Sequence, residues 1–184
     1  MAVIARWISI LAHPFVMVAL LVASTIPPAE VPRSLALVTV AAILPVGVLM
    51  ALQVRRGSWA NVDASSQSER PVLFVVAAMG LVALLVSLFL LRPQSILLKG
   101  ASAALTMLII SAVTSRWLKV SLHMAFASFA TTTLLLLGSL IGAGLLLVLP
   151  LLAWSRLYLR RHAPSELVAG VIVGAATGFA LYYL

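Results

Sequence analysis

The chain has 184 residues, of which 64% are hydrophobic and 9% are charged, and it contains no cysteine. This composition excludes an ordinary soluble domain, and the lack of cysteine excludes disulfides, thiolate metal sites and thiol nucleophiles. The net charge is +8, but the basic residues cluster at the ends of apolar segments, so nucleic acid is not an expected partner.

The apolar segments predict membrane helices, because each approaches the roughly 20 residues that cross a bilayer. The first segment superficially resembles a signal peptide, and we interpret it as a first membrane helix. Breaks fall at Pro27-Pro28, in the polar loop Arg55–Arg70 and at Arg92–Ser95. The predicted helices are approximately 8–26, 35–54, 71–91, 95–115, 121–138, 139–154 and 165–184.

The stretch from Ser121 to Trp154 is too long for one crossing. As a single helix it would measure roughly 50 Å, against a hydrocarbon core of about 30 Å. Gly138-Ser139 and Gly142–Gly144 offer places to turn, which favours a helical hairpin. The predicted fold is therefore an all-α polytopic membrane bundle of seven transmembrane helices, or six if the first segment lies in the membrane interface. No polar segment is long enough to fold alone, so residues 1–184 are expected to form a single integral membrane domain.

With seven crossings, the loops 55–70, 115–121 and 155–165 open on the same side of the membrane. The positive-inside rule predicts that this side is cytoplasmic, because basic residues concentrate in cytoplasmic loops. The expected location is a cell membrane, with several passes. Nine of the twelve basic residues lie on that side, namely Arg6, Arg55, Arg56, Arg70, Arg116, Lys119, Arg156, Arg160 and Arg161.

The densest group of reactive side chains comes just before the last apolar segment. Ser155-Arg156 is followed after five residues by His162 and after three more by Glu166. On a helix, a histidine and a carboxylate four residues apart share one face, so Glu166 can hold the tautomer of His162. Charged groups at the mouth of an apolar helix are costly and usually functional. We therefore expect a catalytic or binding site at this point.

Two further polar segments open helices on the same side, Glu69-Arg70-Pro71 and Lys119–His123. Together with the segment from Ser155 to Glu166, they resemble the three-part signature of the type 2 phosphatidic acid phosphatase family. That signature reads Lys-x6-Arg-Pro, Pro-Ser-Gly-His and Ser-Arg-x5-His-x3-Asp. The resemblance covers roughly residues 63–170, and it implies a membrane phosphatase core at approximately residues 55–184.

The resemblance also implies a role for each matching residue. His162 would be the nucleophile that forms a phosphohistidine, Glu166 matches the aspartate that orients it, and His123 matches the acid that protonates the leaving group. The groups implied to bind the phosphate are Arg70, Ser121, Ser155 and Arg156.

The chain departs from this signature at four positions. Asp63 stands where the family has its lysine, Val120 and Leu122 replace the proline and glycine of the second motif, and Glu166 replaces the final aspartate. Asp63 cannot hold an anion, so another cation must replace the lysine in space, and Lys119 is the preferred candidate. The alternatives are Arg55, Arg56 and Arg116.

The expected function is that of a metal-independent membrane lipid phosphatase. Forked arginines suit a tetrahedral dianion, and one histidine can attack while a second donates a proton. The histidines and carboxylates are too scattered for a metal site, so no metal or other cofactor is expected. The substrate would be a membrane lipid such as phosphatidate, phosphatidylglycerophosphate or a polyprenyl diphosphate. The alternative is a non-catalytic transporter or a protein that binds anionic lipids.

His13 and the glycines of the last apolar segment are expected to have structural roles. His13 precedes Pro14 in the first helix and has no matching partner. Small residues every four positions let a neighbouring helix approach closely, which is the role expected for Gly170, Gly174 and Gly178. The resembled family usually acts on the extracytoplasmic face, whereas the charge distribution favours the cytoplasmic one, and both alternatives stay open.

Overall fold

The computed structural model of the chain describes residues 1–26, 33–59, 66–91 and 96–183, the side chains of 33–36 aside. These residues form helices and no strand, which confirms the all-α fold. The predicted breaks at Pro27-Pro28 and Arg92–Ser95 lie outside the described residues. The elements are α1 (Ala2–Leu11), α2 (Pro14–Thr25), α3 (Arg33–Arg55), η2 (Gln67–Glu69), α4 (Arg70–Leu91), α5 (Ile96–Thr114), α6 (Leu122–Leu136), α7 (Leu140–Tyr158) and α8 (Pro164–Tyr183).

Within the described ranges, five helices are long and apolar enough to cross a membrane, and six if α1 and α2 are one bent span. The chain is therefore a helical membrane protein, in which five or six spans can be assigned by length and composition, against the six or seven that the sequence predicts. Helix α6 is not among these helices, because its 15 residues reach only about 22 Å at 1.5 Å per residue.

The chain divides into two compact units, and the structure defines each by itself, not the placement of one relative to the other. The first unit contains Met1–Pro27 and Thr114–Leu184, and the second contains Pro28–Val113. In the second unit, Gly80 of α4 lies against the backbone oxygen of Ala42 in α3. Leu88 and Ala101 form the centre of a small core between α4 and α5.

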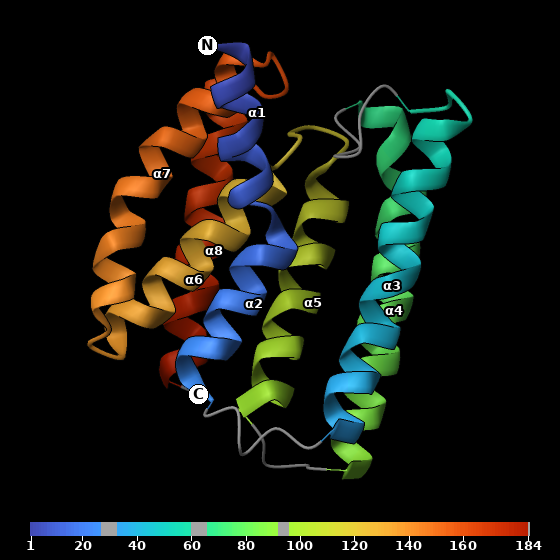
Figure 1. Ribbon diagram of the computed structural model, residues 1–184, viewed down its shortest axis with the longest axis vertical. Helices are drawn as coiled ribbons and strands as arrows, with labels where there is room; N and C mark the ends of the chain where they lie inside the picture. The colour runs from blue at the N-terminus through green and yellow to red at the C-terminus, as the bar shows by residue number, and fades with distance from the viewer. Residues whose placement is uncertain (27–32, 60–65, 92–95, 184) are drawn as a thin grey trace. The chain divides into compact units, whose positions relative to one another are not determined.

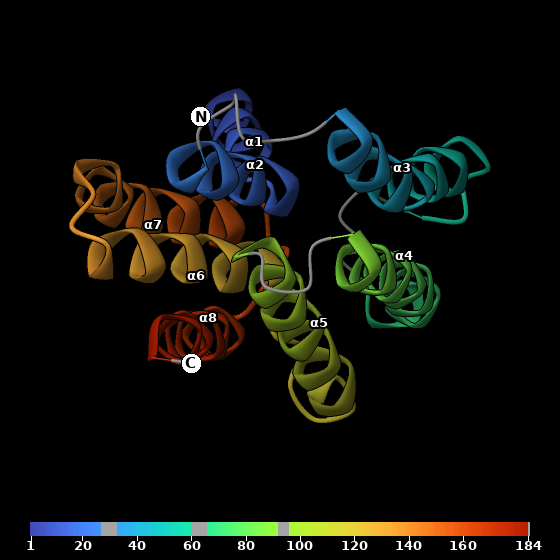
Figure 2. The same ribbon diagram turned by 90° about the horizontal axis from the view of Figure 1, so that it is seen from below.

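Helix α6 is the central helix of the first unit (Figure 1). Figure 2 shows it between α8 on one side and α2 and α7 on the other. Most of its side chains are buried, so it contacts protein around nearly its whole circumference. A helix enclosed in this way is apolar all round, which is why its sequence resembles that of a membrane-crossing segment.

The α6–α7 hairpin turns at Gly138-Ser139, as the sequence predicts. Gly138 has φ +71°, a left-handed conformation that glycine adopts without steric cost. Its N–H bonds the Leu135 carbonyl, and the N–H of Ser139 bonds the Leu134 carbonyl, which is a Schellman ending of α6. The Ser139 hydroxyl then accepts from the N–H of Ile141 and caps α7. One residue pair thus ends one helix and starts the next.

The glycines of α8 pack against α6, as predicted. A Cβ atom on Gly170 would lie 2.7 Å from the Ser121 carbonyl oxygen, and one on Gly174 would overlap the carbonyl oxygen of Ala125. A Cβ atom on Gly178 would lie 3.0 Å from the side chain of Thr132 and 3.2 Å from the Phe129 carbonyl oxygen. Because the contacts of Gly170 and Gly174 are with backbone atoms that cannot move aside, only glycine permits this separation of the two helices. The close packing holds the N-terminal ends of α6 and α8 together.

The first apolar segment is not the single helix that the sequence predicts. Helices α1 and α2 meet at a bend of 45°. Pro14 begins α2, and His13 is its N-cap, with Nδ1 accepting a hydrogen bond from the N–H of Phe15 at 3.3 Å. Proline cannot continue a preceding helix because its ring lacks an N–H and clashes with the previous turn. The bend therefore follows from Pro14.

Candidate functional site

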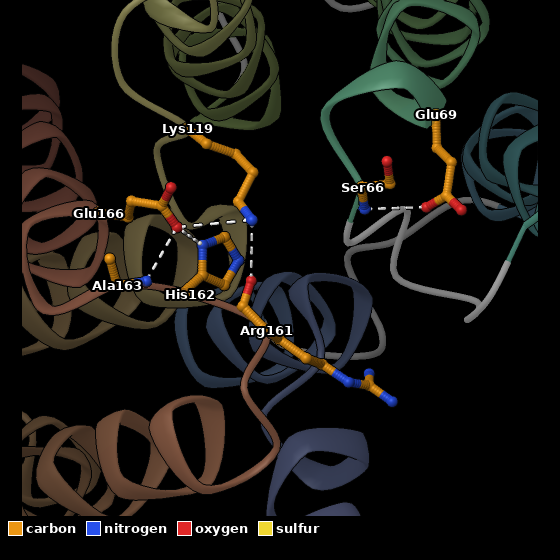
Figure 3. A network of polar contacts seen from close by, with 7 residues as sticks. All are labelled: Ser66, Glu69, Lys119, Arg161, His162, Ala163 and Glu166. Carbon is orange, nitrogen blue, oxygen red and sulfur yellow. Dashed lines mark hydrogen bonds and ion pairs between the residues drawn. The ribbon is translucent and has the colours of Figure 1, made fainter.

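The predicted contact between His162 and Glu166 is present. His162 Nδ1 lies 2.8 Å from Glu166 Oε2, and the same oxygen accepts the N–H of Ala163 at 3.1 Å (Figure 3). The His162 side chain is almost fully buried. With Nδ1 held by the carboxylate, the neutral ring carries its proton on Nδ1, and Nε2 keeps the lone pair. Nε2 is therefore the nitrogen suited to nucleophilic attack.

The expectation that His162 and Glu166 share one face of a helix is wrong, however. Helix α8 begins at Pro164, so His162 precedes the helix and the two residues do not share a helical face. Glu166 lies in the first turn and its side chain reaches back to the N–H of Ala163, as an acidic residue does at a helix start. His162 meets the carboxylate because the chain enters the helix there.

The segment between α7 and α8 is shorter than the predicted loop 155–165. Helix α7 continues through Ser155 and Arg156 to Tyr158. Its end is a Schellman motif in which the N–H of Arg161 bonds the Arg156 carbonyl at 3.0 Å. Arg160 occupies the left-handed position with φ 52°, which costs a non-glycine residue roughly 1–2 kcal/mol. This reversal directs the chain from Arg156 back to His162.

Lys119 lies at the same carboxylate. Its Nζ donates to the Arg161 carbonyl at 3.0 Å and lies 3.6 Å from Glu166 Oε2 (Figure 3). The N–H of Ser121 bonds the Glu166 carbonyl at 3.1 Å. The segments predicted as loops 115–121 and 155–165 therefore do converge. Lys119, the preferred replacement for the family lysine, is beside the predicted nucleophile.

Arg156 is buried and held by the first helix. Its exposed fraction is 1%, and its Nη1 donates to the Ser9 hydroxyl at 2.7 Å. The neighbouring Ser155 donates its hydroxyl to the carbonyl of Ala5 at 2.6 Å. This bond favours a packing role for Ser155 over the phosphate contact predicted from the sequence. Both residues of the motif thus connect α7 to α1.

Ser121 and His123 begin α6 and are both buried. The Ser121 hydroxyl caps the helix, at 3.5 Å from the N–H of Met124. The His123 ring meets the His13 ring edge to face, with centroids 5.1 Å apart. His13, for which the sequence offers no matching partner, thus has a ring contact with His123. Sequence reasoning missed the contacts of Ser9 with Arg156 and of His13 with His123, although polar side chains in an apolar helix are a signal of function.

The first motif lies in the second unit. Arg70 begins α4 and is buried, and η2 before it is capped by Glu69, which accepts the N–H of Ser66 at 3.0 Å (Figure 3). Asp63 lies outside the described residues. That Arg70 belongs to the same site as His162 stays a prediction.

Basic side chains concentrate at the entry to α8. Burial and, to a smaller extent, the nearby charge of Arg6 lower the pKa of Arg161. A like charge and partial desolvation both disfavour the protonated guanidinium. An arriving anion would relieve this repulsion, so the region is electrostatically suited to a phosphate group.

Comparison with known protein families, curated proteins and solved structures finds no match to this chain. The likeness to the phosphatidic acid phosphatase signature therefore stays a prediction. Among the residues that the structure describes, no three His, Asp or Glu side chains are grouped in a way that could hold a metal ion.

Proposed function

We propose that this protein is a membrane phosphatase that removes a phosphate from a lipid through a phosphohistidine intermediate, without a metal. The observation that carries the proposal is the contact of 2.8 Å between His162 Nδ1 and Glu166 Oε2, with Lys119 at the same carboxylate. An imidazole braced by a carboxylate is an activated nucleophile. A lysine beside it supplies positive charge for the phosphate oxygens.

In this reaction His162 Nε2 attacks phosphorus and the bond to the leaving oxygen breaks. His123 donates a proton to that oxygen, which belongs to the lipid alkoxide or to the phosphate of a diphosphate substrate. Water then attacks the phosphohistidine, His123 takes its proton, and inorganic phosphate leaves. Arg156 and Lys119 would neutralise the charge on the equatorial oxygens, which is the main catalytic task in phosphoryl transfer. A contribution of Arg70 is implied only by the resemblance of the sequence to the family signature. Ser121 would contribute a further hydrogen bond.

Phosphate release by the purified protein tests this function. We expect release from at least one of phosphatidate, phosphatidylglycerophosphate and undecaprenyl diphosphate, undiminished by a chelator of divalent cations and inhibited by vanadate. No release from any of the three would contradict the proposal. Lipid binding without release, retained in His162→Ala but weakened in Arg70→Ala and Arg156→Ala, would instead indicate a transporter or anionic-lipid-binding protein.

Lys119 is expected to act mainly in substrate affinity. Because its Nζ lies 3.6 Å from Glu166 Oε2 on the side of His162, Lys119→Met should raise KM for the lipid phosphate about tenfold, which corresponds to about 1.4 kcal/mol. Steady-state kinetics of phosphate release measures this change. Arg116→Gln is the matched control, since Arg116 lies on the same segment but stacks on Trp117 at 4.8 Å. An equal effect of both variants would indicate general loss of positive charge and contradict a specific role.

A further inference from the structure

Two polar side chains at the bend between α1 and α2 contact residues of the second and third motifs of the signature. Ser9 is in the last turns of α1 and His13 is at the bend, four residues later. Ser9 accepts from Arg156 at 2.7 Å, and the His13 ring contacts that of His123 at 5.1 Å. The bend thus supplies one contact to each of two candidate site residues, Arg156 and His123.

We propose that Ser9 and His13 are positioning residues of the candidate site, which makes the α1–α2 bend a functional part of it. The proposal rests on the proposed function, because Arg156 and His123 are its phosphate ligand and its proton donor. The signature on which the function was predicted begins near residue 63, so it assigns nothing to the first 26 residues. The contacts extend the site to this segment.

Ser9 positions the guanidinium of Arg156. Arginine binds phosphate best when its planar fork is held in one orientation. The 2.7 Å bond from Nη1 to the Ser9 hydroxyl fixes one arm of the fork, while the Ser155 bond to the Ala5 carbonyl fixes the same turn of α7 on α1. Loss of the Ser9 hydroxyl should therefore weaken phosphate binding.

His13 positions the ring of His123. Its Nδ1 accepts the N–H of Phe15, so the neutral ring carries its proton on Nε2 and is held in one orientation. The edge-to-face contact then limits the rotation of the His123 ring. Because proton donation requires that ring to point at the leaving oxygen, loss of the His13 imidazole should affect the chemical step.

The test separates ring contact from helix capping. His13→Asn removes the imidazole but keeps a good N-cap for α2. We expect it to lower kcat about tenfold with KM little changed and with an unchanged thermal midpoint in detergent. Ser9→Ala should raise KM about tenfold, and Ser9→Thr should restore it. Ser24→Ala is the matched control, because the Ser24 hydroxyl bonds only within α2, at the Leu20 carbonyl.

A double-mutant cycle decides whether His13 acts through His123. If it does, His13→Asn should cost little further activity in the His123→Ala background. A full tenfold loss in that background, or variants at Ser9 and His13 that behave like Ser24→Ala, would overturn the inference.

Binding of inorganic phosphate, measured by titration calorimetry, separates failure of this inference from failure of the proposed function. If the unaltered protein binds phosphate but releases none from lipids, the proposed function fails. A tenfold weaker binding by Ser9→Ala would then still support the positioning of Arg156. If the unaltered protein neither binds phosphate nor releases it, both proposals are overturned.

Discussion

Replacing His162 with alanine should reduce phosphate release by roughly 10⁴-fold or more, because removal of a nucleophile leaves only the contribution of substrate binding. The contact of 2.8 Å with Glu166 Oε2 holds the ring with Nε2 free of that carboxylate, and alanine has no group that could take over the attack. Initial rates with a lipid phosphate in detergent micelles measure the loss. In the unaltered protein, labelled substrate should also leave an acid-labile phosphoryl group on the chain, and His162→Ala should not acquire it.

Arg160→Gln is the matched control for this experiment. Arg160 lies two residues before His162 on the same segment, and none of the bonds that hold His162 and Glu166 involves its side chain. We expect activity within a few-fold of the unaltered protein. Retention of phosphate release by His162→Ala would show that the nucleophile is a different group and would contradict the proposed mechanism.

Replacing Gly174 with alanine should destabilise the protein by about 1–3 kcal/mol, the usual cost of adding a methyl group to a packed interface. The added Cβ would overlap the carbonyl oxygen of Ala125, and a backbone atom in a helix cannot move aside without separating α6 from α8. Unfolding in mixed micelles measures the change. Activity should fall as well, because α6 carries His123 and α8 carries Glu166.

Gly144→Ala provides the comparison. Gly144 lies within α7, and a Cβ there would have no atom within 4 Å. In this position alanine should be neutral or stabilising by up to about 1 kcal/mol, since glycine is a poor helix former. Equal destabilisation by the two substitutions would mean that the close approach of α6 and α8 is not what Gly174 provides.

Several local features could be predicted from the sequence because their causes lie within a few residues. The turn at Gly138-Ser139 follows from one glycine that adopts positive φ and one serine that caps the next helix. The approach of α8 to α6 follows from a glycine every fourth residue. The contact of His162 with Glu166 was predicted from spacing, although its actual cause is the reach of Glu166 around the start of α8.

The number of membrane crossings could not be predicted from local sequence patterns. Hydropathy measures how apolar a segment is, and a helix enclosed by protein is as apolar as one exposed to lipid. Helix α6 belongs to the enclosed kind, so its composition resembles that of the membrane-crossing helices although it has only 15 residues. Likewise, the bend at Pro14 lies inside an apolar stretch that hydropathy treats as one helix.

By itself, the sequence determined an all-helical membrane protein, its hairpin, its glycine packing face and the pairing of His162 with Glu166. Each of these depends on composition or on residues that are close along the chain. Only the tertiary structure decided that α1 contacts the third motif, since Ser155 bonds Ala5 and Arg156 bonds Ser9 across 150 and 147 residues. Such contacts arise when helices pack, and no local pattern specifies which helix will supply the partner of a buried arginine or histidine.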